Sequence, residues 1–365
     1  MKKTLFIHIG SFKTGTSALQ DFISVNKDAL QQEGVYIPTS TGKGHHELVV
    51  ALLRRFTDFN ARWAGYDSIK GSDCDNIWNQ LIKEIDDTSC SKVLVSSELF
   101  CDIVNEHCRD HSQEIGEYIS NKLKNVDVKI ICYFRDIKQY AKSMYKELLK
   151  VSSLKLNYSQ QLCEFINNKS IHIYPNIYLD FYSNLFGREA LSIYEYKKSL
   201  LYRGSLEHDF FKREPFNISL DGFVFRNYIL NESIPDSLVP IKLALNQVGI
   251  KDVAFNRYLS DMLRSSSEEF SVDYSLLEKL NTMVDEEADK YDLNFTPFVK
   301  EDLDIKSNIS QESMILTVQN AIIIKQNRNI EHKLDLILGP KGGFNIKVKN
   351  KFKKLLSHFF NKGHK

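Results

Sequence analysis

The sequence lacks both a long apolar stretch and an excess of one charge. Its 365 residues contain no uninterrupted run of about 18 apolar residues, the length that a membrane-spanning helix needs. Lys and Arg number 48 against 47 Asp and Glu. Because a near-neutral chain has no general attraction for polyanions, we expect no nucleic-acid partner, and any anion site must be local.

Cysteine is present but lacks the spacing of a metal site or of a disulfide framework. None of the six cysteines belongs to a Cys-x-x-Cys pair. Scattered thiols are typical of a reducing compartment, so we expect a cytoplasmic protein, and we expect no metal. The apolar residues 5–9 are too few for the core of a secretory signal and include His8. We therefore expect them to form a first strand.

Apolar runs and amphipathic stretches alternate along the first half of the chain. Residues 4–9, 92–95 and 128–134 are typical of buried strands, and the most periodic helix follows the last of them. In that helix the apolar positions are Ile137, Tyr140, Ala141, Met144, Tyr145 and Leu148. The alternation predicts a three-layer α/β fold with a mostly parallel central sheet. In such sheets ligands bind at the carboxyl ends of the strands.

A turn rich in Gly, Ser and Thr joins the first predicted strand to the first predicted helix, expected over residues 17–32. It reads Gly10-Ser11-Phe12-Lys13-Thr14-Gly15-Thr16-Ser17. Such a turn directs successive backbone N–H groups inward, and the following helix adds the positive end of its dipole. The turn therefore predicts a binding site for one phosphate group. A tight turn that binds nothing is the alternative.

The position of the lysine separates this turn from an ATPase phosphate-binding loop. In G-x-x-x-x-G-K-[ST] the lysine follows the last glycine, whereas Lys13 precedes Gly15. Lys13 is thus expected at the outer edge of the turn, where a cation stabilises charge on the bridging oxygen of a leaving phosphate. The sequence also lacks a clear acidic strand end for Mg²⁺. Both features count against a magnesium-dependent small-molecule kinase.

A second anion site is predicted where the strand over residues 128–134 ends. Arg135 follows this strand directly, and Ser143 lies eight residues later on the next helix. An arginine at a strand end offers a planar fork to a phosphate, and a serine hydroxyl adds a neutral donor. The alternative is a structural ion pair, for which Asp136 is the nearest candidate.

The two sites together resemble the phosphosulfate-binding elements of the sulfotransferases that use 3′-phosphoadenosine-5′-phosphosulfate (PAPS). The loop is similar to their strand–K-[ST]-G-[ST]-[ST]–helix pattern, and Gly34-Val35-Tyr36-Ile37-Pro38 resembles the bacterial carbohydrate-type branch. The resemblance covers about residues 4–215 and implies a P-loop-like fold. It implies that Lys13 stabilises the leaving phosphate. By the same resemblance, the 5′-phosphate is expected to be held by Thr14, Gly15, Thr16 and Ser17. The 3′-phosphate is expected to be held by Arg135 and Ser143.

Sulfuryl transfer also needs a general base that removes a proton from the acceptor. Glu98 follows the strand over residues 92–95, at the place where the family has a catalytic His or Glu. His45 and His46 begin another predicted helix, and an imidazole with a pKa of about 6.5 suits a base near neutral pH. Glu98 is favoured, and both histidines stay open.

The remaining chain is expected to be mainly helical. We expect a core domain over residues 1–215, its helical completion over 216–310, a helix over 311–338, and a linker with a basic amphipathic tail over 339–365. Apolar residues spaced by seven over 316–337 indicate a possible homodimer. The tail over 347–365 indicates a peripheral contact with an anionic membrane surface, or else a solvated end.

The sequence therefore predicts a PAPS-dependent sulfotransferase. Its acceptor is expected to be a hydroxyl of a carbohydrate, which follows from the resemblance alone. The alternatives are the magnesium-dependent kinase and a catalytically inactive module that recruits a partner.

Overall fold

The computed structural model describes residues 3–42, 44–58, 66–152, 154–226, 233–247 and 274–303. The chain divides into two compact units. The first comprises Met1–Glu147, Leu156–Ser233 and Ser271–Ile305, and the second comprises Leu148–Lys155, Ile234–Phe270 and Lys306–Lys365. All the site residues named above belong to the first unit. The domain boundaries expected at residues 215, 310 and 338 stay predictions.

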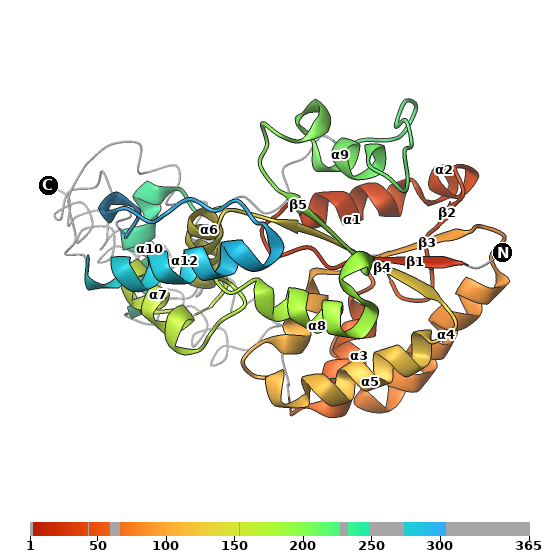
Figure 1. Cartoon of the computed structure of the whole chain (residues 1–365), viewed down its shortest axis with the longest axis horizontal. Coiled ribbons are helices and arrows are strands. Elements are labelled where there is room, and N and C mark those ends of the chain that lie inside the picture. Colours follow the sequence, from red (N-terminus) through yellow and green to blue (C-terminus); the bar gives the residue numbers. More distant parts are fainter. Residues whose placement is uncertain are drawn as a thin grey trace, which may run out of the picture. The chain divides into compact units, whose positions relative to one another are not determined.

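A five-stranded parallel sheet forms the centre of the first unit (Figure 1). Its strands, in the spatial order β2-β3-β1-β4-β5, are Val35–Tyr36, Lys92–Ser96, Thr4–His8, Asp127–Phe134 and Leu191–Glu195. The predicted α/β class with a parallel central sheet is confirmed. β1 lies between β3 and β4, where the strand order reverses, and this is the position at which open α/β sheets bind ligands.

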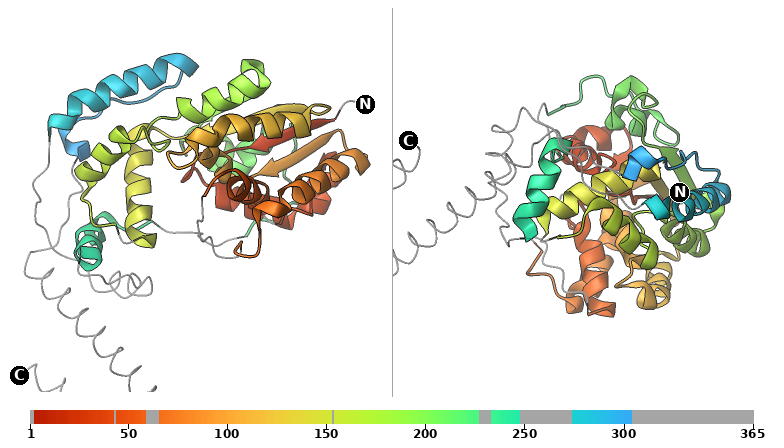
Figure 2. Two further views of the ribbon diagram at one scale, coloured as in Figure 1. Left: turned by 90° about the horizontal axis from the view of Figure 1, so that it is seen from below. Right: turned by 90° about the vertical axis from the view of Figure 1, so that its left-hand side faces the viewer.

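Helices cover both faces of the sheet, which gives three layers (Figures 1 and 2). One face carries α1 (Thr16–Val25), α2 (Lys27–Gln32) and α9 (Leu206–Lys212). The other carries α3 (His46–Phe56), α4 (Cys74–Asp87), α5 (Ser112–Leu123) and α8 (Asn176–Phe186). In the part of the chain that the structure describes, the remaining α-helices are α6 (Ile137–Val151), α7 (Tyr158–Asn167), α10 (Val239–Gln247) and α12 (Leu277–Tyr291).

Alternate residues of β1 face the two layers, as the twofold period of a strand requires. Leu5 and Ile7 pack with α3, α4 and α5, whereas Phe6 packs with α1 and α9. His8 follows Phe6 on the latter side and contacts the rings of Tyr133 and Phe210. Both faces of the strand are therefore buried, which is why its sequence is almost continuously apolar.

The helix expected over residues 17–32 is divided at Asn26. The Asn26 side chain donates to the Phe22 carbonyl oxygen at 2.9 Å, and its carboxamide oxygen accepts from the Val224 amide at 2.8 Å. These bonds tie residue 26 to a distant segment and end α1 before α2 begins.

In the second unit, Asn246 of α10 donates to the carbonyl oxygens of Leu149 and Leu154.

The predicted seven-residue repeat over 316–337 and the basic tail over 347–365 lie outside the described residues. Within the described ranges, no helix is long and apolar enough to span a membrane. All six cysteines lie in those ranges, and none of them forms a disulfide.

Candidate active site

The carboxyl ends of three adjacent strands bring the predicted site residues together. The Ser97 amide, just after β3, donates to the His8 carbonyl oxygen at 3.0 Å, and the Ser11 amide, after β1, donates to that of Tyr133 at 3.4 Å. These bonds fix the start of the Gly10–Ser17 loop between the end of β3 and the end of β4. Glu98 follows the end of β3 after Ser97, and Arg135 directly follows β4, so they flank the loop on opposite sides.

The loop backbone turns sharply at three positions with positive φ. The φ angles are 31° at Gly10, 66° at Lys13 and 83° at Gly15. A lysine rarely adopts this conformation, and such residues gather where the surrounding structure imposes a functional geometry. Thr16 and Ser17 open α1, so their amides have no acceptor within the helix. The loop and the helix terminus together offer N–H donors to an anion.

The loop hydroxyls have different roles from one another. The Thr14 hydroxyl, fully buried, donates to the Ser11 carbonyl oxygen at 2.6 Å, and the Ser11 hydroxyl donates to that of Tyr133 at 3.2 Å. The Thr16 side chain is buried against Gly10, and Ser17 is half-buried. Thr14 and Ser11 thus hold the loop in shape, which leaves Ser17 as the hydroxyl best placed for a ligand.

Lys13 forms an ion pair with Glu147 of α6 at 2.9 Å. The two side chains are only 17% and 26% exposed, so water screens the pair little. The lysine is therefore held at the edge of the loop toward α6. An anionic ligand in the loop would compete with Glu147 for this ammonium group.

Tyr196 connects the loop to the second predicted anion site. A Cβ at Gly15 would lie 3.2 Å from the Tyr196 hydroxyl oxygen, so this tyrosine borders the loop. Burial raises the pKa of Tyr196, and the nearby Arg135 cation opposes the rise. Tyr196 follows β5 as Arg135 follows β4, and its amide donates to the Phe134 carbonyl oxygen at 2.6 Å. Tyr196 therefore lies close to both the loop and Arg135.

Arg135 is half-buried, and burial lowers the pKa of its guanidinium. Its Nε donates to the Gln139 side-chain oxygen at 3.3 Å, and within the described ranges it has no ion pair with a carboxylate. Such a cation is available to an anionic ligand. Ser143 lies half-buried two turns further along α6.

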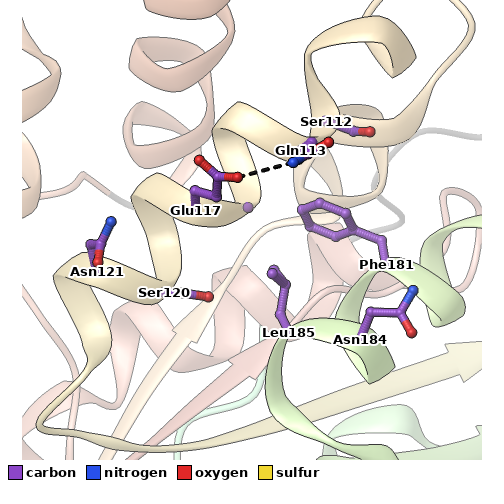
Figure 3. Close-up of a pocket in the computed structure, with 9 residues that line it drawn as sticks. Ser112, Gln113, Glu117, Ser120, Asn121, Phe181, Asn184 and Leu185 are labelled. Carbon is purple, nitrogen blue, oxygen red and sulfur yellow. Dashed lines mark hydrogen bonds between the residues drawn. The ribbon is translucent and has the colours of Figure 1, made fainter.

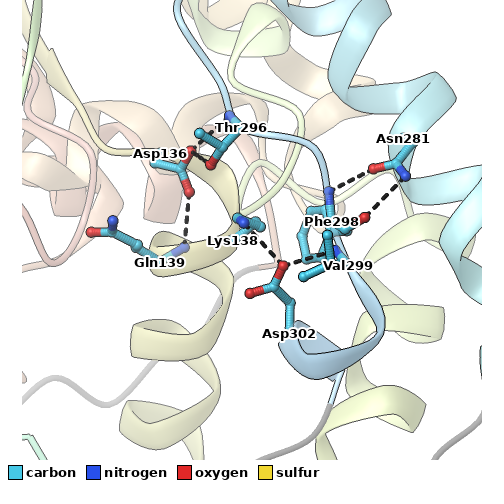
Figure 4. A network of polar contacts seen from close by, with 8 residues as sticks. All are labelled: Asp136, Lys138, Gln139, Asn281, Thr296, Phe298, Val299 and Asp302. Carbon is cyan, nitrogen blue, oxygen red and sulfur yellow. Dashed lines mark hydrogen bonds and ion pairs between the residues drawn. The ribbon is translucent and has the colours of Figure 1, made fainter.

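Asp136, the alternative partner of Arg135, is bound by another segment (Figure 4). One carboxylate oxygen accepts from the amide and the hydroxyl of Thr296 at 2.9 and 2.5 Å, and the other accepts from the Gln139 amide at 3.4 Å. Beside it, Lys138 pairs with Asp302 at 2.9 Å. The segment after α12 is thereby fastened to the start of α6, and Asp136 is used for that purpose.

Glu98 and His46 lie together on the other side of the loop. A Glu98 carboxylate oxygen accepts from the Gln20 side-chain amide of α1 at 2.6 Å. His46 Nδ1 lies 2.6 Å from the Ser97 hydroxyl oxygen. Burial lowers the pKa of His46, and the negative charge of Glu98 opposes that shift. A carboxylate and a neutral imidazole therefore share one site beside the first turns of α1.

The two other histidines of this region are buried more deeply. His45 is 1% exposed, its Nδ1 accepts from the Ser96 amide at 3.2 Å, and burial lowers its pKa to about 4. His8 is fully buried with Nδ1 2.8 Å from the Ser96 hydroxyl oxygen, and burial lowers its pKa to about 3. Both rings pack around the end of β3 and support the strand end that carries Glu98.

A groove of about 570 Å³ lies elsewhere, between α5 and α8 (Figure 3). Phe181 and Leu185 line it from α8, and polar residues such as Ser120 and Asn121 line it from α5. Its one charged lining residue is Glu117, which would repel an anion. None of the predicted site residues lines this groove, so it is separate from the candidate active site.

Sequence reasoning missed three residues that the fold adds to the site: Gln20, Tyr196 and Glu147. Tyr196 directly follows β5, so the rule that ligands bind at strand ends could have included it. Gln20 lies one turn after Thr16 on α1, which places it near the loop. No sequence signal indicated Glu147, because its contact with Lys13 joins residues 134 positions apart.

The fold and the site define an α/β protein whose cationic side chains gather at the carboxyl ends of its central strands. No protein-family model and no curated protein matches the chain. Among solved structures, a sulfotransferase from Alicyclobacillus acidocaldarius matches at a TM-score of 0.35 and 18% identity, over 70% of this chain and 100% of that one.

Replacing Gly15 with alanine should weaken the binding of a phosphate-bearing ligand at the loop by about tenfold or more, as expected for the loss of charge-assisted hydrogen bonds. The new Cβ would press on Tyr196 and on Leu206, 3.3 Å away, and would strain the loop. Gly34→Ala is the matched control. Its φ of 80° is nearly the same, but a Cβ there meets nothing within 4 Å. Equal binding by both variants, measured by calorimetry, would contradict a role for the loop.

Proposed function

We propose that the chain is a PAPS-dependent sulfotransferase that transfers a sulfuryl group to a hydroxyl of a carbohydrate. The observation that carries this proposal is the pairing of two cationic sites at the ends of β1 and β4. One is the loop with Lys13, the other is Arg135, and Tyr196 lies close to both. The carbohydrate acceptor rests on the resemblance of residues 34–38 to the bacterial branch of the family.

Two separated cationic sites match the two phosphate-bearing ends of the adenosine bisphosphate. In the proposal, the amides of the loop and the start of α1 bind the 5′-phosphate. Arg135 binds the 3′-phosphate, with Ser143 as the neutral donor. Because Lys13 precedes Gly15, it stands at the edge of the loop and next to the transferred group. No metal is needed for this arrangement.

The reaction needs one proton transfer and one displacement at sulfur. Glu98 accepts the proton of the acceptor hydroxyl, and the acceptor oxygen forms a new bond to sulfur. The bond between sulfur and the bridging oxygen breaks, and its electron pair leaves with the 5′-phosphate. Lys13 stabilises the charge that develops on this oxygen, as preorganised cations do in related phosphoryl transfers. Gln20 holds the Glu98 carboxylate in place.

Transfer of radiolabelled sulfate from PAPS to a panel of oligosaccharides tests the proposal with the full-length protein. We expect label in the acceptor and one bisphosphate released for each sulfate transferred, with no requirement for magnesium. Phosphoryl transfer from ATP with magnesium, and none from PAPS, would favour the kinase alternative. Bisphosphate binding with no transfer to any acceptor would favour the inactive module.

A further inference from the structure

The environment of His46 determines which of its two ring nitrogens carries the proton. Its Nδ1 lies 2.6 Å from the Ser97 hydroxyl oxygen. Ser97 is fully buried, and its oxygen also accepts from the Leu99 amide at 3.3 Å, as the N-cap of the 3-10 helix Glu98–Val104. A serine hydroxyl has one proton to donate. The tautomer of His46 therefore depends on where the Ser97 proton points.

The buried Ser97 hydroxyl needs a hydrogen-bond acceptor, and this need determines the tautomer of His46. Buried hydroxyl groups donate when an acceptor is in reach, and His46 Nδ1 is the acceptor that the described residues provide to Ser97. With Ser97 donating, Nδ1 accepts. Burial lowers the pKa of His46 from 6.5, so the ring is neutral at physiological pH. A neutral imidazole with Nδ1 as acceptor carries its proton on Nε2.

The Nε2 edge of His46 lies in the same cluster as Glu98. A Cβ at Gly44 would lie 2.7 Å from His46 Nε2 and 3.2 Å from the Gln20 side-chain oxygen. The amide of the same Gln20 side chain donates to Glu98 at 2.6 Å. Other titratable groups here are Tyr66, whose ring packs edge-on against His46 at 5.7 Å, and Glu47. Burial raises the pKa of Tyr66, and the charges of Glu47 and Glu98 raise it further. Within this cluster, Glu98 supplies a proton acceptor and His46 Nε2 supplies an N–H donor.

We propose that His46 binds the acceptor substrate by donating a hydrogen bond from Nε2 to an oxygen next to the reacting hydroxyl. This inference rests on the proposed function and deepens it. Glu98 accepts the proton of the reacting hydroxyl, and His46 recognises the neighbouring oxygen. The pair selects an alcohol with a second oxygen beside it, as in the vicinal diols of sugars. An alkylammonium group cannot take the place of this neighbouring oxygen, because it has N–H donors but no lone pair to accept a hydrogen bond from Nε2.

The tautomer is read directly by ¹⁵N NMR of the histidine-labelled full-length protein, with His46→Gln used for assignment. We expect a proton on Nε2 and an unprotonated Nδ1 at neutral pH. Ser97→Ala should abolish this preference, because it removes the donor that holds Nδ1. A proton on Nδ1 in the wild type would overturn the inference. This measurement needs no turnover, so it stands independently of the proposed function.

The binding role is read from steady-state kinetics on a diol acceptor. His46→Leu should raise the acceptor KM about tenfold, the factor that one hydrogen bond contributes, with a smaller change in kcat. His46→Gln restores an N–H donor and should recover most of the loss. Gly44→Ala keeps the imidazole but displaces it, because the new Cβ would lie 2.7 Å from Nε2, and should raise KM as His46→Leu does. An unchanged KM in His46→Leu, with transfer intact, would overturn the inference.

Failure of the proposed function has a different signature. A protein that binds no adenosine bisphosphate and transfers no sulfate would contradict the sulfotransferase proposal and, with it, the assignment of a substrate to His46. A protein that transfers sulfate but fails the two His46 tests would keep the proposed function and lose the inference alone.

Discussion

Replacing Lys13 with methionine is expected to lower kcat for sulfuryl transfer by about 10²–10³, the effect of removing one preorganised electrostatic donor. Methionine keeps much of the length of the side chain and removes its charge. The positive φ of 66° at this residue shows that the loop holds the lysine in an uncommon backbone conformation. Quench-flow measurement of a single turnover separates this chemical step from product release.

The ion pair with Glu147 provides the control for the Lys13 experiment. Lys13→Met leaves the Glu147 carboxylate without its cation, so part of any loss could reflect a disturbed α6. The double variant Lys13→Met/Glu147→Gln removes both charges and should be as slow as the single variant. Lys124→Met, an exposed position at the end of α5, should behave as wild type. Recovery of the rate in the double variant would contradict a catalytic role for Lys13.

Replacing Glu98 with glutamine is expected to lower kcat by about 10²–10⁴, the range for loss of a general base. The carboxamide has nearly the same shape, so binding of the adenosine bisphosphate should be unchanged. Gln20 donates to Glu98 at 2.6 Å and orients the carboxylate. Gln20→Ala should therefore give a smaller loss of kcat, since the base would remain but would be poorly positioned.

The Glu98 experiment also separates the three base candidates of the sequence. Near-normal kcat in Glu98→Gln would contradict the assignment and would return the role to a histidine. His46 would then be the better candidate, because His45 is 1% exposed and its Nδ1 already accepts from the Ser96 amide. Glu33→Gln, at an exposed position after α2, is the matched control and should keep full activity.

The fold was largely predictable because its central strands are buried on both faces. β1 and β4 appear in the sequence as short apolar runs, and the helix after β4 repeats its apolar residues at helical spacing. The division of α1 from α2 was not predictable. It depends on the Asn26 side chain bonding to Val224, which is 198 residues away.

The candidate site was predictable only where a residue lies on a strand end or in the loop. Lys13, Glu98 and Arg135 are of this kind, and local order along the chain is enough to place them. No local pattern indicates that Thr14 turns its hydroxyl inward to the Ser11 carbonyl oxygen. Nor could the sequence choose between His45 and His46, because adjacent residues differ in burial only once α3 is packed.

The measurement that tests the central claim most directly is calorimetric titration of adenosine 3′,5′-bisphosphate, without magnesium, into the wild type and Arg135→Ala. We expect tight binding by the wild type and a loss of about ten- to a hundredfold in the variant, as removal of charge-assisted hydrogen bonds predicts. Because Arg135 has no carboxylate ion pair in the described residues, the variant should fold normally. Absence of wild-type binding, or equal binding by the variant, would contradict the account.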